Sequence, residues 1–190
     1  QYDELSQKVV ERVKQVKVGH PLDTSIKMGP VVSEAQYQKV LSYIQIAKDE
    51  GAELLLGGNA MEIDGCPGGY FVEPTVFGNV TSTMRIAQEE VFGPIMSLMP
   101  YDDLDEAVEI ANSTTYGLTA AVWTNDYSTA MELSRSIEAG YVWINGIGNH
   151  YRGLPYGGYK NSGIGREEGL DEMLSYTEVK SLTFAMGQAE

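Results

Sequence analysis

A pair of carboxylates, an aromatic ring and a Gly-Pro turn lie within the six residues from Glu89 to Pro94. The carboxylate of Glu90 is able to accept hydrogen bonds from two neighbouring hydroxyls at once, as a sugar diol requires. On an extended backbone Phe92, two residues later, lies on the same side and offers its ring face to a planar ligand. A solvated glutamate pair beside a buried phenylalanine is the alternative interpretation of the same residues.

A second candidate site is the loop 146–159, which follows a predicted strand at 141–145. The loop contains His150 and Tyr156 among several glycines, and it is too long for a simple connection. Ligands of open α/β sheets collect at the carboxyl ends of strands. We therefore expect this loop to line a pocket, with an ordinary surface loop as the alternative.

The sequence supplies no good nucleophile and no metal site. Cys66, the single cysteine, lies in a polar loop with no histidine or helix start beside it to activate the thiol. His20 and His150 are far apart and have no cysteine near them, so we expect no metal and assign no catalytic residue. The glycines of the segment GIGREEG are followed by two acidic residues, which argues against a phosphate-binding fingerprint. We expect these glycines to permit tight turns and close packing.

Composition narrows the class of protein. The chain has 190 residues, 43% of them hydrophobic and 21% charged, which is typical of a globular domain. The net charge of −14 argues against nucleic acid and anionic membranes as partners, because both require a basic face. A single cysteine is consistent with a reducing compartment, and we expect a cytoplasmic protein.

The apolar spacing predicts alternating strands and helices, which indicates an α/β fold with a parallel sheet and crossover helices. Pro74 interrupts the predicted strand at 70–80, so we expect this strand to be bent or to lie at an edge of the sheet. Capping residues are expected at Ser33, with Gln36 completing a capping box, and at Asp103 and Asp126. The expected helices are 2–18, 33–50, 84–90, 103–111, 126–137 and 166–175, and the expected strands are 52–56, 70–80, 95–99, 118–123, 141–145 and 177–186.

Four motifs resemble one family over almost the whole chain. The strings EEVFGPI, NSTTYGLTAAVWTND, GYVWIN and LPYGGYKNSGIGREEG are similar, in order and spacing, to the aldehyde dehydrogenase superfamily, of the betaine-aldehyde or broad-specificity hydrolytic type. The resemblance implies that Glu90 binds the nicotinamide ribose of NAD or NADP and that Phe92 packs beside the nicotinamide. It also implies that His150 and Tyr156 line the tunnel for a small-molecule aldehyde, where His150 would admit a polar or hydroxylated substrate.

The same resemblance implies that part of the enzyme lies outside these residues. The family's cysteine nucleophile, its general-base glutamate and its cofactor domain precede a segment such as Tyr2–Glu4. Residues 1–175 would then be the C-terminal part of the catalytic domain, and 176–190 an oligomerisation strand of a homo-oligomer. We expect the isolated chain to be inactive and to hold no cofactor.

Two other functions compete with this interpretation. An acylating semialdehyde dehydrogenase or reductase shares the scaffold, although the intact Glu90/Phe92 motif favours the hydrolytic branch. A non-enzymatic α/β interaction module would act through the terminal strand.

Overall fold

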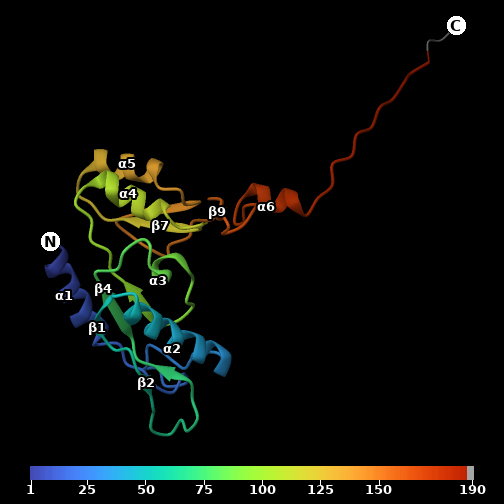
Figure 1. Ribbon diagram of the computed structural model, residues 1–190. Helices are drawn as coiled ribbons and strands as arrows, with labels where there is room; N and C mark the ends of the chain where they lie inside the picture. Colours follow the sequence, from blue (N-terminus) through green and yellow to red (C-terminus); the bar gives the residue numbers. More distant parts are fainter. Residues whose placement is uncertain (188–190) are drawn as a thin grey trace. The chain divides into compact units, whose positions relative to one another are not determined.

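The computed structural model describes residues 1–187, which form two compact units, Gln1–Thr114 and the described residues from Thr115 onward (Figure 1). The first contains α1 (Tyr2–Val13), α2 (Glu34–Asp49), β1 (Glu53–Leu56), β2 (Ala60–Met61), β3 (Phe71–Val72), β4 (Thr75–Gly78), α3 (Arg85–Gln88), β5 (Ile95–Ser97) and α4 (Leu104–Asn112). The second contains β6 (Tyr116–Gly117), β7 (Thr119–Val122), α5 (Tyr127–Ser136), β8 (Tyr141–Ile144), β9 (Tyr159–Lys160) and α6 (Leu170–Ser175).

The first unit is built on a three-stranded sheet in the order β1-β4-β5. β4 pairs antiparallel with β1 and parallel with β5, where Thr75 lies opposite Ile95. β4 lies in the middle of this sheet and all four of its residues are buried, so the alternative of an edge strand is wrong for 75–78, whereas β3 pairs with β2 alone. Pro74 stands just before β4, where its missing N–H removes no ladder bond, and the expected bend separates β3 from β4.

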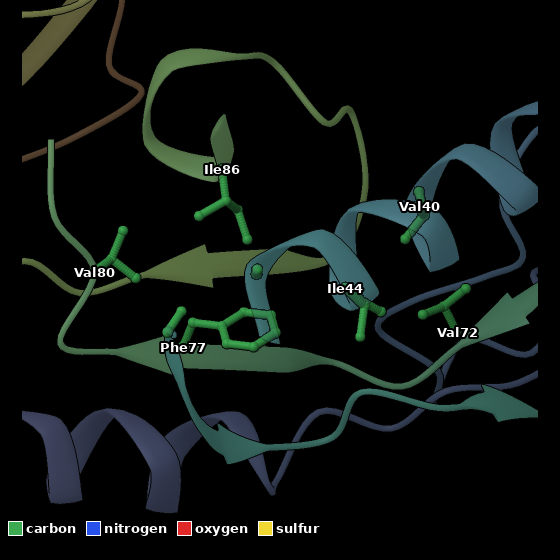
Figure 2. Close-up of a cluster of buried hydrophobic side chains, with 8 residues drawn as sticks. Val40, Ile44, Val72, Phe77, Val80 and Ile86 are labelled. Carbon is green, nitrogen blue, oxygen red and sulfur yellow. The ribbon is translucent and has the colours of Figure 1, made fainter. Parts of the chain in front are cut away.

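The core of the first unit lies between α2 and the sheet (Figure 2). Figure 2 shows Val40 and Ile44 on α2 and Phe77 on β4 converging on one cluster, which Ile86 of α3 also joins. Phe77 and Val40 have no exposed surface. Full burial of each such side chain stabilises the fold by roughly 1.5–3 kcal/mol, so this cluster fixes α2 against the strands.

The three capped helices start as expected, but other helix boundaries were wrongly predicted. α6 begins at Leu170 rather than near 166, because Glu167 pairs with Tyr156, and α3 ends at Gln88 rather than 90. The Oγ of Ser33 accepts from the N–H of Gln36, and Asp103 and Asp126 cap α4 and α5 in the same way. α1 ends at Val13 rather than near residue 18. Val18 instead forms a bridge with Met28, and this pairing replaces the last expected helical turn.

The second unit contains a β7–α5–β8 crossover. β7 and β8 are parallel, with Thr119 opposite Tyr141 and Val122 opposite Ile144. This confirms the α/β class with parallel strands and a crossover helix. The short antiparallel pair β6–β9, in which Tyr116 lies opposite Lys160 and Gly117 opposite Tyr159, was not predicted from the sequence.

The segment after α6 forms no strand within the described residues 177–187. The predicted strand at 177–186 is therefore not present in the single chain, since a strand needs a partner for its backbone groups. Its side chains are open to solvent, Val179 to 99% and Phe184 to 85%. The predicted oligomerisation segment 176–190 also includes 188–190, which lie outside the described residues. In the described part of the chain, no helix has the length and apolarity to cross a bilayer.

Candidate functional site

The two adjacent glutamates after α3 have different surroundings. Both oxygens of the Glu89 carboxylate are bound by Arg85, with Nε–Oε1 2.8 Å and Nη2–Oε2 2.9 Å, and Tyr43 of α2 also donates its hydroxyl to this carboxylate. These hydrogen bonds, from Arg85 first and Tyr43 second, lower the pKa of Glu89 to about 2. The bond to Glu89 raises the pKa of the Tyr43 hydroxyl. Glu89 is therefore a structural anchor between α3 and α2.

Glu90 is exposed, and its carboxylate makes no hydrogen bond or ion pair within residues 1–187. Only its backbone is held, because the Nζ of Lys39 donates to the Glu90 carbonyl at 3.0 Å. A carboxylate with all its lone pairs free and a fixed backbone is suited to accept hydrogen bonds from a ligand. The structure thus separates the two carboxylates that the sequence presents as equivalent.

Gln36 holds the next two residues of the motif. Its Nε2 donates to the carbonyls of Val91 at 2.8 Å and Phe92 at 3.0 Å. The expected capping box is therefore only half formed: the backbone of Gln36 serves the cap at Ser33, while its side chain reaches the motif. Gln36 and Lys39 of α2 together donate to three consecutive backbone carbonyls, those of residues 90–92, which lie more than 50 positions further along the sequence.

Phe92 differs from its expected conformation. Its φ is +58°, in the left-handed region, so the backbone is not extended as predicted. The ring is 73% exposed, which excludes the alternative of a core phenylalanine within this chain. A left-handed non-glycine residue persists only where its surroundings hold it, and such residues concentrate at functional sites. Here the bonds from Gln36 supply that restraint.

The Gly-Pro turn completes the motif. A Cβ added at Gly93 would lie 2.4 Å from the Cγ2 of Val40, so the turn packs directly on the buried face of α2. The carbonyl of Pro94 accepts from the N–H of Thr75 at 2.9 Å, which joins the turn to the start of β4. The motif is thus fixed at both ends to the core of the first unit.

In the second unit, two rings of β8, Tyr141 and Trp143, meet two rings of the loop that follows it, His150 and Tyr156. His150 stacks on Tyr141, with ring centroids 5.6 Å apart and planes at 15°, and lies 4.7 Å from Tyr156 and 5.9 Å from Trp143. The Nε1 of Trp143 donates to the carbonyl of Asn149 at 2.9 Å, which fixes the loop next to His150. The structure therefore brings together the two loop residues, His150 and Tyr156, that the sequence singled out.

A fifth residue of this cluster was not predicted. Glu168 accepts from the Nδ1 of His150, with distances of 2.8 Å to Oε1 and 3.0 Å to Oε2. Local pattern gives no signal for a contact between residues 18 positions apart. The sequence also contains no signal that the Gln36 side chain would contact Phe92, because Gln36 was expected to complete the cap at Ser33. The pairing of Arg85 with Glu89 is visible in the sequence only as an i, i+4 spacing.

The remaining candidates from the sequence have ordinary surroundings. Cys66 is a free thiol in the loop between β2 and β3. The glycines of the 157–165 segment serve the two expected purposes. Gly157 and Gly158 allow close packing, because a Cβ on Gly157 would lie 2.6 Å from the carbonyl oxygen of Gly165 and one on Gly158 would lie 2.5 Å from Ser162. Gly163 and Gly165 instead allow turns, because their φ angles are +129° and +85° and a Cβ on either would meet nothing. Across residues 1–187, no three His, Cys, Asp or Glu side chains are grouped to hold a metal ion.

Comparison with known proteins identifies the family. The family model for the aldehyde dehydrogenase family matches residues 1–182. Betaine aldehyde dehydrogenase of Mesorhizobium japonicum is 46% identical over 186 residues, which are 98% of this chain and 38% of that protein. Aldehyde dehydrogenase tropH of Talaromyces stipitatus is 44% identical and is matched over 99% of this chain and 37% of its own length.

Solved structures agree with this match. Betaine aldehyde dehydrogenase of Staphylococcus aureus, in complex with NAD+, has a TM-score of 0.87 at 40% identity, covering 92% of this chain and 35% of that one. An aldehyde dehydrogenase of Bacillus cereus has a TM-score of 0.88 at 43% identity, covering 95% and 36%. The chain belongs to the aldehyde dehydrogenase family. It spans a little over a third of the length of these relatives.

Proposed function

We propose that these residues are the C-terminal part of the catalytic domain of an NAD(P)-dependent aldehyde dehydrogenase. The whole enzyme would oxidise an aldehyde to a carboxylic acid through a cysteine thioester. Membership of the family supports the reaction class. The Staphylococcus aureus relative was solved in complex with NAD+, which supports the choice of cofactor. Residues 1–175 would contribute to the catalytic domain and 176–190 to assembly.

The observation that carries this proposal is the unequal treatment of Glu89 and Glu90. The carboxylate of Glu89 accepts hydrogen bonds from Arg85 and Tyr43. The carboxylate oxygens of Glu90 are free of hydrogen bonds within residues 1–187, and the Glu90 backbone is restrained by Lys39. We assign Glu90 to bind the two hydroxyls of the nicotinamide ribose, and the exposed ring of Phe92 to pack beside the nicotinamide. The bound cofactor supplies the hydride acceptor, and the residues of this chain orient it.

The aromatic cluster of the second unit supports the substrate side of the proposal. His150 and Tyr156 lie with their rings 4.7 Å apart and present both apolar faces and polar atoms. Such a mixture is typical of small-molecule sites, in which a few polar groups set the orientation of a ligand. We assign these two residues to the wall that contacts the aldehyde.

The nucleophile is assigned to a part of the enzyme outside these 190 residues. The single thiol, Cys66, lies in the β2–β3 loop; neither histidine is near it in sequence, and neither forms a hydrogen bond with it within residues 1–187. A thiol without an activating neighbour is a weak nucleophile at neutral pH. We therefore expect the isolated chain to show no aldehyde oxidation.

The test compares the product of the native gene with the isolated chain and two variants. The native product should reduce NAD(P) in the presence of an aldehyde, and the 190-residue chain should not. In the native product, Glu90→Gln should raise the KM for the cofactor about tenfold, the usual effect of weakening hydrogen bonds to a charged group. Glu109→Gln, an exposed glutamate of α4, is the matched control and should leave this KM unchanged.

Two results would contradict the proposal. A native product that oxidises no aldehyde with either cofactor would remove the reaction class. An unchanged cofactor KM in Glu90→Gln would remove the ribose assignment while leaving the enzyme in place.

A further inference from the structure

We propose that Glu168 is a positioning residue that sets the hydrogen-bonding state of His150, and that the pair selects aldehydes carrying a hydroxyl group. The inference rests on the proposed function, in which His150 contacts the aldehyde. It goes further by naming the substrate class and by assigning a role to Glu168.

The contact between the two side chains fixes which nitrogen of the ring carries a proton. Glu168 reaches Nδ1 of His150 with both oxygens, at 2.8 and 3.0 Å. An ionised carboxylate has only acceptor sites, so Nδ1 must be the donor. The neutral imidazole then has its proton on Nδ1 and its lone pair on Nε2.

Glu168 is itself held in place by its backbone. Its φ is +62°, in the left-handed region, and this conformation persists in a glutamate only where neighbours enforce it. The N–H of Glu168 donates to the Oε2 of Glu172 at 2.7 Å, and its carbonyl accepts from the N–H of Gly153 at 3.0 Å. Next to it, Glu167 and Tyr156 form a two-way backbone bridge, so the carboxylate is presented from a fixed point.

The imidazole ring is fixed by its aromatic neighbours. It stacks on Tyr141 at 15° and lies against Tyr156 and Trp143. Within residues 1–187 no hydrogen bond reaches Nε2. The pair therefore offers one acceptor atom among apolar ring faces.

This arrangement distinguishes ligands by their donors. The His150 side chain is 35% exposed, so its acceptor loses water only when a ligand covers it. A ligand that covers Nε2 without a matching O–H or N–H loses free energy, and this penalty discriminates more strongly than an added methylene does. An aldehyde with a terminal hydroxyl fills the acceptor, whereas its alkyl counterpart leaves it without a partner. A trimethylammonium group would be attracted by the ring faces but has no hydrogen to donate to Nε2.

The test measures one ratio in the native gene product, namely kcat/KM for 3-hydroxypropanal divided by kcat/KM for butanal. These aldehydes have the same number of heavy atoms and differ by a hydroxyl in place of a methyl group. The ratio should exceed one and should fall about tenfold in both Glu168→Leu and His150→Phe, the loss expected for one hydrogen bond. Glu168→Gln should keep the ratio, because the amide oxygen still accepts from Nδ1.

The control is Glu167→Leu, which removes the neighbouring carboxylate and should leave the ratio unchanged. A ratio unaffected by either Glu168→Leu or His150→Phe would overturn the inference alone, since oxidation itself persists. Equal damage from Glu168→Gln and Glu168→Leu would overturn it too, by showing that the negative charge matters rather than the tautomer. A preference for betaine aldehyde over 3-hydroxypropanal that depends on Glu168 would do the same. Absence of any aldehyde oxidation would instead refute the proposed function.

Discussion

Glu89 and Glu90 are adjacent and have the same side chain, yet their contacts with α2 and α3 give the two carboxylates different chemistry. Arg85 and Tyr43 bind the first, and α2 binds only the backbone of the second. A bidentate guanidinium pair is among the strongest contacts a carboxylate makes, so Glu89 has little capacity left for a ligand. The adjacent residue keeps its full capacity because a hydrogen bond to its carbonyl leaves the side chain free.

The pH dependence of stability should report the anchor at Glu89. The pKa of its carboxyl is lowered from the ordinary 4.5 to about 2, mainly by Arg85. A lowered folded-state pKa stabilises the fold above pH 4.5, and this contribution is lost as the pH falls toward 2. In denaturant titrations between pH 6 and pH 2, the free energy of unfolding should therefore fall more steeply in the native protein than in Glu89→Gln. Parallel curves for the two proteins would show that the Arg85 contact adds no stability.

Glu90→Gln is the control for the same titration. Its side chain has no partner among the described residues, so this variant should follow the native curve.

Gln36 should affect the cofactor through the backbone that it holds. Gln36→Leu removes both bonds from Nε2 to the carbonyls of Val91 and Phe92, and leaves the backbone N–H that serves the Ser33 cap. We expect the KM for NAD(P) of the native gene product to rise about fivefold, the effect of about one net hydrogen bond, with kcat changed less. Steady-state kinetics at saturating aldehyde measure both values.

Gln38→Leu is the matched control for Gln36, since it changes an exposed glutamine of the same helix. The positioning role of Gln36 would be excluded if both glutamine variants had equal kinetics.

At the scale of elements, the sequence predicts what depends on neighbouring residues. The caps at Ser33, Asp103 and Asp126 were correct because the capping side chain and the backbone N–H that donates to it lie three positions apart. The end of α1 was wrong because Val18 pairs with Met28, a competitor that helical spacing does not reveal.

Contacts between distant residues explain the rest of what was missed. The β6–β9 pair, the reach of Gln36 to Phe92, and the bond between Glu168 and His150 all join positions that are far apart in the sequence. Each depends on tertiary packing, which overrides local preference. The residues of the candidate site could thus be named from motifs, whereas the residues that hold them in place could not.

The packing of the Gly93 turn on α2 can be tested by a double-mutant cycle. Gly93→Ala places a Cβ 2.4 Å from Val40 and should destabilise the protein by about 1–3 kcal/mol through overpacking. Val40→Ala alone should also destabilise it, because it leaves a cavity in the core. In the double variant the added methyl enters space vacated by Val40, so the combined loss should be smaller than the sum of the two. Simple additivity in denaturant titrations would show that the turn and helix do not touch as described.

At the scale of the whole molecule, the described part of the segment after α6 has no strand partner, and its apolar side chains are exposed in the single chain. Val179, Leu182, Phe184 and Met186 are between 71% and 99% exposed. Apolar residues exposed together are characteristic of a protein interface, and an unpaired segment of this kind can pair with the edge of another chain. This supports the proposal that residues 176–190 assemble the enzyme into a homo-oligomer.

We expect Phe184→Asp to lower the oligomeric mass of the native gene product. A buried charge without a partner would cost several kcal/mol at each copy of the interface, which is enough to shift a subunit equilibrium at micromolar concentration. Light scattering after size exclusion measures the mass directly. Leu22→Asp is the matched control, because Leu22 is 85% exposed in the first unit and the same charge there should leave the mass unchanged. If both variants kept the native mass, the tail would not be the assembly element. If both lost it, the charge would be acting on the fold rather than on an interface.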